Sequence, residues 1–136
     1  MTKWAHSLIR ISTYEVEMLQ KRLAEITARR VSAEMRVATL DAEHEVERER
    51  AHGDADAVAM MPAYLMGWRV RRAAAQGQVD LIVEEERGAR ETLAQAFEAQ
   101  KKFEHVAEVS RLQANAEAGK REAAMLDELA IQRSAG

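Results

Sequence analysis

The N-terminal part of the chain carries apolar residues that alternate at spacings of three and four. This alternation is the heptad period of a coiled coil, because it places one narrow apolar stripe along a helix. Eight of the ten stripe positions are apolar, while the residues between them are mostly charged and read as a solvated surface. We therefore predict a first helix over residues 5–52. Its stripe consists of Ile9, Ser12, Val16, Leu19, Leu23, Ile26, Arg30, Ala33, Val37 and Leu40.

A second stripe with the same period predicts a second helix over residues 63–131, followed by a frayed tail at 132–136. Twelve of its sixteen positions are apolar, but five of these are alanine, so this stripe is thinner than the first. Beyond Ala114 the pattern drifts, and larger apolar residues return near Leu126. The stripe consists of Met61, Leu65, Trp68, Arg72, Ala75, Val79, Ile82, Glu86, Ala89, Leu93, Ala96, Gln100, Phe103, Ala107, Ser110 and Ala114.

Turn signals separate the two stripes. Gly53 is a suitable C-cap for the first helix, and Asp54 or Asp56 is a suitable N-cap for the second. Pro62 is tolerated at a first helical turn but costs about 3 kcal/mol inside a helix. We therefore predict that the chain reverses over residues 53–62.

The expected fold is all-α: one long antiparallel two-helix coiled-coil hairpin over residues 1–136. At a rise of about 1.5 Å per residue, the first helix would measure roughly 70 Å and the second roughly 100 Å. The second helix would therefore overhang the start of the first. Two helices that bury one stripe each leave no pocket for a small-molecule substrate.

Composition agrees with this fold. Alanine occurs 26 times, 32% of residues are charged and only 4% are aromatic, as in long helices and coiled coils. The net charge of −3 argues against a nucleic-acid binder, and the absence of cysteine excludes disulfides and thiolate chemistry. The sequence offers neither a signal peptide nor a membrane span, so we expect a cytoplasmic protein.

The sequence contains no recognised catalytic motif. Phosphate-binding loops, dinucleotide fingerprints, zinc-protease motifs and nucleophile elbows are all absent. Glu49 and His52 have the E-x-x-H spacing, but a di-iron bundle requires two such motifs and two more glutamates. A solvated charged face is the better interpretation. We therefore expect no catalytic residue, no metal and no cofactor.

Two segments could contact partners. The basic cluster Arg69, Arg71 and Arg72 could meet an acidic protein surface, cover apolar neighbours as a solvated face or, less favourably, bind nucleic acid. In residues 57–70, eleven of fourteen positions are apolar or aromatic. A two-helix seam covers about half of them, so we favour a partner-binding tip over a self-contained hydrophobic cap.

Two C-terminal stretches carry a family resemblance: Lys-Lys-Phe-Glu-His-Val-Ala-Glu at 101–108 and, more closely, the Leu-Asp-Glu-Leu-Ala core within 121–133. Through these stretches, its length and its lone helical hairpin, the chain resembles the flagellar FliJ family, the small coiled-coil stalk and chaperone of the flagellar type III export ATPase. The likeness covers nearly the whole chain in pattern and the last of these stretches in residues. Family members are often more basic than this chain.

The resemblance implies a non-catalytic central stalk and general chaperone, at the inner membrane beneath the flagellum. One end would bind the hexameric export ATPase, the turn end would reach the membrane export gate protein, and substrate-escort chaperones are further partners. By position, the family's ATPase contact corresponds to Trp4, Leu8, Ile9, Leu126, Leu129 and Arg133. The gate contact corresponds to Met61, Tyr64, Leu65, Trp68 and Arg72.

Two other function classes fit the residues. One is a coiled-coil scaffold or oligomerisation module with unrelated partners. The other is a helical-bundle enzyme formed by dimerisation. Stimulation of a hexameric ATPase would favour the stalk, a stable homodimer indifferent to that ATPase would favour the scaffold, and bound iron or manganese would favour the enzyme.

Overall fold

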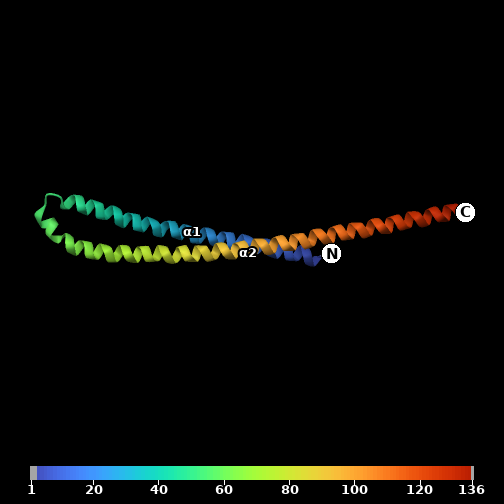
Figure 1. Ribbon diagram of the computed structural model, residues 1–136, viewed down its shortest axis with the longest axis horizontal. Coiled ribbons are helices and arrows are strands. Elements are labelled where there is room, and N and C mark those ends of the chain that lie inside the picture. The colour runs from blue at the N-terminus through green and yellow to red at the C-terminus, as the bar shows by residue number, and fades with distance from the viewer. Residues whose placement is uncertain (1–2, 136) are drawn as a thin grey trace. The chain divides into compact units, whose positions relative to one another are not determined.

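The computed structural model describes residues 3–135, which form two helices and no strand. Helix α1 spans Lys3–Ala51 and helix α2 spans Ala55–Ala135 (Figure 1). The two helices pack against each other as a helical hairpin, which confirms the predicted fold class. The chain divides into two compact units, residues 19–93 and residues 1–18 with 94–136, and each is described by itself.

The unit of residues 19–93 contains the chain reversal. Gly53 adopts a left-handed φ of 83°, which glycine reaches without a steric penalty. The backbone N–H of Asp54 donates to the carbonyl of Ala51, and the Asp54 side chain accepts from the N–H groups of Asp56 and Ala57. These contacts end α1 and cap α2, so Gly53 and Asp54 act as the sequence analysis expected.

The predicted length of the turn was wrong. Helix α2 begins at Ala55 rather than at residue 63, and Pro62 lies inside the helix. The Asp54 cap and the alanine-rich first turns favour helix upstream of the proline. Pro62 and Val58 are both exposed, so water can hydrate the Val58 carbonyl that loses its N–H donor.

The interior of this unit consists of the predicted stripe together with Ala51, which lies beyond the end of the stripe on α1. Every predicted stripe residue between Leu19 and Leu93 is buried or half-buried. The most buried apolar side chains come from both helices, and one carboxylate, that of Glu86, is buried with them. These apolar residues are Ile26, Leu40, Ala51, Val79 and Ile82.

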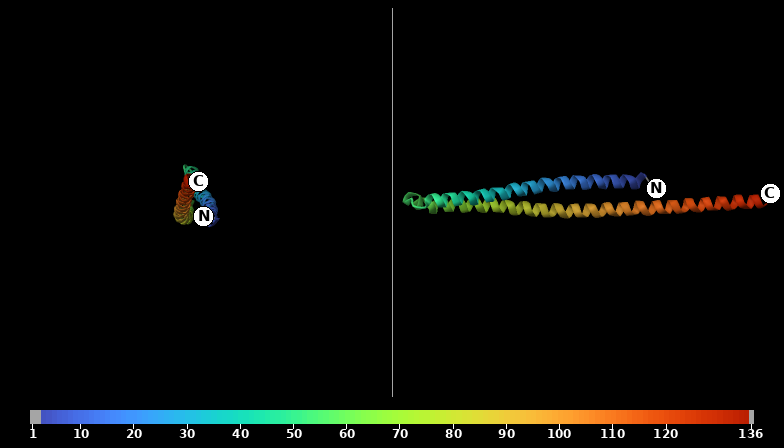
Figure 2. Two further views of the ribbon diagram at one scale, coloured as in Figure 1. Left: turned by 90° about the vertical axis from the view of Figure 1, so that its right-hand side faces the viewer. Right: turned by 90° about the horizontal axis from the view of Figure 1, so that it is seen from above.

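The other unit pairs the start of α1 with the last part of α2. Ala5, Val16 and Ala96 are its buried apolar residues, and the buried Ser12 hydroxyl donates to the Ile9 carbonyl. From residue 111 to residue 135 every residue of α2 is exposed. Figures 1 and 2 show this stretch continuing beyond the N-terminus of α1, as the predicted overhang required.

The helix ends differ slightly from the predicted bounds. Helix α1 runs from Lys3 to Ala51 rather than over 5–52. The tail predicted to fray at 132–136 remains helical as far as Ala135, and Ser134 donates a hydrogen bond to the Ala130 carbonyl. Gly136 lies outside the described residues. Neither helix, as described, has a stretch long and apolar enough to cross a membrane.

Candidate interaction surfaces

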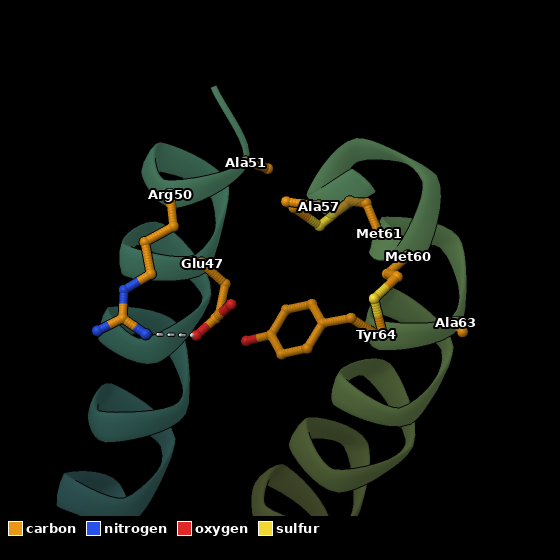
Figure 3. A pocket seen from close by; sticks show the side chains of 8 residues that line it. All are labelled: Glu47, Arg50, Ala51, Ala57, Met60, Met61, Ala63 and Tyr64. Atoms are coloured by element: carbon orange, nitrogen blue, oxygen red, sulfur yellow. Dashed lines mark hydrogen bonds and ion pairs between the residues drawn. The ribbon is translucent and has the colours of Figure 1, made fainter. Parts of the chain in front are cut away.

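A groove of about 340 Å³ lies beside the chain reversal. The last turns of α1 form one wall and the first turns of α2 form the other, and Figure 3 shows the Tyr64 ring reaching across toward Glu47. Its lining is mostly apolar, and two of the predicted gate-contact residues, Met61 and Tyr64, belong to it. We call this the tip groove, lined by Glu47, Arg50, Ala51, Ala57, Met60, Met61, Ala63 and Tyr64.

The first turns of α2 expose several large apolar side chains. Met60 is 73% exposed, and Val58 and Met66 on the same helix are also exposed. Methionine side chains adapt their shape to a partner, and exposed apolar patches mark interaction sites. Both Met60 and Met66 belong to the apolar segment 57–70, but neither was among the predicted contact residues, because neither occupies a stripe position.

Trp68 lies in the interface between the helices rather than on the rim. Its indole N–H donates to the Leu40 carbonyl over 2.7 Å, and its ring stacks on His44 with ring centroids 4.4 Å apart. His44 also stacks near Tyr64 at 6.3 Å, and its buried Nδ1 has no hydrogen-bond partner. These contacts give Trp68 a packing role within the hairpin.

Arg72 also contacts the opposite helix. The Arg72 guanidinium binds the Asp41 carboxylate through two hydrogen bonds, of 2.6 and 3.2 Å. This pairing lowers the pKa of Asp41 and raises the pKa of Arg72, because each charge stabilises the other. Leu65 is half-buried. Of the predicted gate-contact residues, the structure therefore places Met61 and Tyr64 at the groove, Trp68 and Arg72 in contact with α1, and Leu65 at a half-buried position.

The predicted ATPase contact falls into two groups. On α1, Trp4 is exposed, while Leu8 and Ile9 are half-buried. Ile9 lines a shallow groove of about 500 Å³ that includes Ala107 and Ala114 of α2.

The C-terminal group lies further along α2. Leu126, Leu129 and Arg133 belong to the stretch in which every residue is exposed, which we call the terminal segment, residues 111–135. The structure therefore does not bring this group against the α1 group. Leu112 and Ile131 are equally exposed apolar residues of the terminal segment that the sequence analysis did not name. The loss of the stripe after Ala114 was the signal that could have identified Ile131, whereas Leu112 lies between the stripe positions Ser110 and Ala114.

The other candidate groups of the sequence were a possible metal site and a basic cluster. Within residues 3–135 no group of three histidine, aspartate or glutamate side chains is placed to hold a metal ion. Glu49 and His52 are both exposed beside Arg48 on a shallow polar surface. The basic cluster divides, since Arg72 pairs with Asp41 while Arg69 and Arg71 are exposed.

Comparison with known proteins gives the family. The chain is 54% identical, over 135 residues, to the flagellar FliJ protein of Caulobacter vibrioides strain NA1000 / CB15N and equally to that of strain ATCC 19089 / CIP 103742 / CB 15. Each alignment covers 99% of this chain and 97% of the relative. No protein-family model and no solved structure matches the chain. At this identity over nearly the full length of both proteins, the chain belongs to the flagellar FliJ family.

Proposed function

We propose that this chain, a component of flagellar export, acts as a non-catalytic stalk and general chaperone. In this role it binds the hexameric export ATPase and couples it to the membrane export gate. The observation that carries the proposal is the terminal segment, a helical stretch whose every residue is exposed although it holds large apolar side chains. Such a surface is costly in water unless a partner covers it.

The terminal segment suits a partner with several equivalent subunits. At 3.6 residues per turn, four of its five large exposed apolar residues fall on one side of the helix and Ile131 lies apart, so subunits arranged around the helix would meet different side chains. A binding partner whose subunits interact unequally with a central element has its conformational states biased by those differences. The chain therefore needs no catalytic group to influence ATP hydrolysis. The large apolar residues are Leu112, Met125, Leu126, Leu129 and Ile131.

The tip groove suits the second attachment. An apolar cleft bordered by an exposed methionine and a tyrosine can accept apolar side chains from a partner, and Tyr64 is a typical anchor residue. We assign this groove to the cytoplasmic domain of the export gate. Two partners on one chain give the coupling that a stalk requires. This role places the protein in the cytoplasm, at the inner membrane beneath the flagellum, where escort chaperones would also meet it.

The test compares two matched double variants in the ATPase assay. Leu126→Ala with Leu129→Ala removes apolar surface from the terminal segment, and Met35→Ala with Leu81→Ala removes comparable exposed surface elsewhere. We expect the first pair to abolish stimulation of the purified export ATPase by this protein and the second to preserve it. Equal activity of the two variants would contradict the assignment of the terminal segment.

The tip groove is tested by binding to the gate domain. Met60→Ala with Tyr64→Ala should weaken binding at least tenfold, whereas the Met35→Ala and Leu81→Ala variant should bind normally. A protein that forms a stable homodimer and binds neither partner would be a coiled-coil scaffold instead.

A further inference from the structure

Three hydrogen bonds between the helices join the same kinds of side chain. In each, a short polar side chain of α1 meets a longer polar side chain of α2, and the donor–acceptor distances are 3.0, 3.0 and 2.6 Å. Two lie in the unit of residues 19–93 and one lies in the other unit. We call them the polar rungs: Thr13 with Gln100, Thr27 with Glu86, and Asp41 with Arg72.

The polar rungs follow a strict spacing. Their members on α1 are fourteen residues apart, and so are their members on α2. Fourteen residues are two heptads. On α2 the rung residues occupy the same stripe position in every second heptad, and an apolar residue occupies that position in each heptad between them. Polar and apolar layers therefore alternate along the helix. The alternating apolar residues are Leu65, Val79 and Leu93.

The rung at Glu86 includes the most hydrogen-bond and ion-pair partners. Glu86 is only 8% exposed, yet its carboxylate accepts from Thr27 and from the Arg30 guanidinium, the latter over 2.9 Å. Arg90 adds a further ion pair at 3.4 Å. These partners lower the pKa of Glu86, because they stabilise its charged form. The buried Glu86 carboxylate is destabilising unless its hydrogen-bond and ion-pair partners are in place.

An apolar stripe alone does not define how the two helices align. Heptads repeat, so a displacement of one helix by seven residues again sets stripe against stripe, and an alanine-rich stripe discriminates poorly between alignments. The polar rungs remove this ambiguity. A seven-residue displacement in one direction would set Glu86 against Glu34 and Arg72 against Arg48, and like charges repel. In the other direction Leu23 would replace Arg30 beside Glu86 and Asp41 would meet the apolar Leu65, and buried unpaired groups are strongly destabilising.

A displacement of fourteen residues fails as well. In one direction it sets the Asp41 carboxylate against Glu86, and like charges repel. In the other it sets Asp41 against the apolar Val58. The side chains of the three rungs therefore match in only one alignment.

We propose that the polar rungs are positioning residues that set the register of α1 against α2. In the unit that contains both chain termini, the register at Thr13 and Gln100 determines which part of α2 extends past the start of α1. That part is the terminal segment. The consequence for ATPase binding depends on the proposed function, whereas the register itself does not.

The test measures the register directly. The chain contains no cysteine, so Ser32→Cys and Ala74→Cys, both at exposed positions, can carry a unique pair of spin labels. A displacement of seven residues moves one label by roughly 10 Å along the helix. Pulsed electron paramagnetic resonance resolves such a change in the distance between the labels.

The test variant carries Arg72→Ala, Glu86→Ala and Gln100→Ala. Its matched control removes the same three residue types from exposed positions, through Arg71→Ala, Glu84→Ala and Gln95→Ala. We expect one distance in the parent and the control, and a second, displaced population in the test variant. A single unchanged distance in the test variant would overturn the proposal, because the apolar stripes would then suffice.

A reciprocal exchange decides the question if the test variant loses its helices. Arg72→Asp alone sets two carboxylates against each other and should broaden the distance distribution. Adding Asp41→Arg restores an opposite pair and should restore the single distance. Failure of the double variant to recover that distance, or its helical content, would also overturn the proposal.

The ATPase assay separates this inference from the proposed function. If the test variant shows a displaced population yet stimulates the ATPase normally, the rungs set the register but the terminal segment does not act on the ATPase. If the distance is unchanged, the register proposal fails whatever the ATPase does.

Discussion

The chain contains two tryptophans, and the structure gives them opposite surroundings. Trp4 is 58% exposed, whereas Trp68 stacks on His44 and donates its indole N–H to the Leu40 carbonyl. Both were predicted to contact partners, Trp68 as an aromatic anchor of the apolar segment 57–70 and Trp4 through its position in the family resemblance. Sequence spacing could not reveal that Trp68 has a polar partner across the interface, since the carbonyl of Leu40 belongs to the other helix.

This difference predicts different effects on stability. Trp68→Ala should lower the free energy of unfolding by about 2–4 kcal/mol, because it removes packed aromatic surface and leaves a carbonyl without its donor. Trp4→Ala should change it by no more than about 0.5 kcal/mol. Urea unfolding followed by circular dichroism measures both. If the two variants lose equal stability, the interface around His44 is not as described.

Carboxylates paired with arginine predict how stability depends on pH. The pKa values of Asp41 and Glu86 are lowered in the folded state, so these groups bind protons more weakly there than in the unfolded chain. Their contribution is present above the unfolded pKa of about 4 and is lost as pH falls through the lower folded pKa. Glu86→Gln should therefore lower stability at pH 7 and reduce the loss between pH 5 and pH 3.

Urea midpoints measured from pH 7 to pH 3 check this prediction. The exposed Glu84 gives the matched variant, Glu84→Gln, which should leave the pH profile nearly parallel to that of the parent. A parent profile that stays flat down to pH 3 would show that the ion pairs contribute nothing to folding.

At the scale of elements, the start of α2 departs most from expectation. The Asp54 cap predicts that the helix begins there, whereas Pro62, eight residues later, predicts a start at the proline. The predicted helix start followed the proline. In the structure the Asp54 cap prevails, and Pro62 lies inside the helix. The cost of an internal proline is a lost hydrogen bond and a local clash, which exposure to water makes tolerable near a helix end.

Pro62→Ala tests this arrangement. The substitution should raise the free energy of unfolding by about 1–3 kcal/mol, because it restores the N–H donor for the Val58 carbonyl and removes the ring. Thermal unfolding measures the gain, and amide hydrogen exchange of residues 55–61 should slow. Unchanged exchange and stability would indicate that α2 begins beyond the proline, as the sequence analysis predicted.

At the scale of the whole molecule, the sequence predicted the two helices, the position of the reversal and the buried stripes. These features depend on local periodicity and on turn residues such as Gly53, which can be recognised in a single sequence. Arg72, Glu86 and Gln100 are visible in the sequence as polar breaks in an apolar stripe. That each break meets a matching residue of α1 is not visible there, because the match depends on the alignment of the helices.

The candidate surfaces were predicted less completely. The apolar segment 57–70 drew attention to the tip, but the division between the exposed Met60 and the packed Trp68 depends on which side of the helix faces α1. The terminal segment could be expected from the difference in helix length. The role of its individual residues depends on partners that the chain alone does not specify.

The terminal segment has a thermodynamic consequence of its own. A single helix surrounded by water gains nothing from tertiary packing, and short helices of this kind are only marginally stable. In the unbound protein its last turns should open and close rapidly, so that amide protons there exchange with solvent long before those of the packed stripes. The partner that covers this stretch must also supply the free energy that keeps it helical. Partner affinity and the helical stability of the stretch therefore change together when the temperature changes.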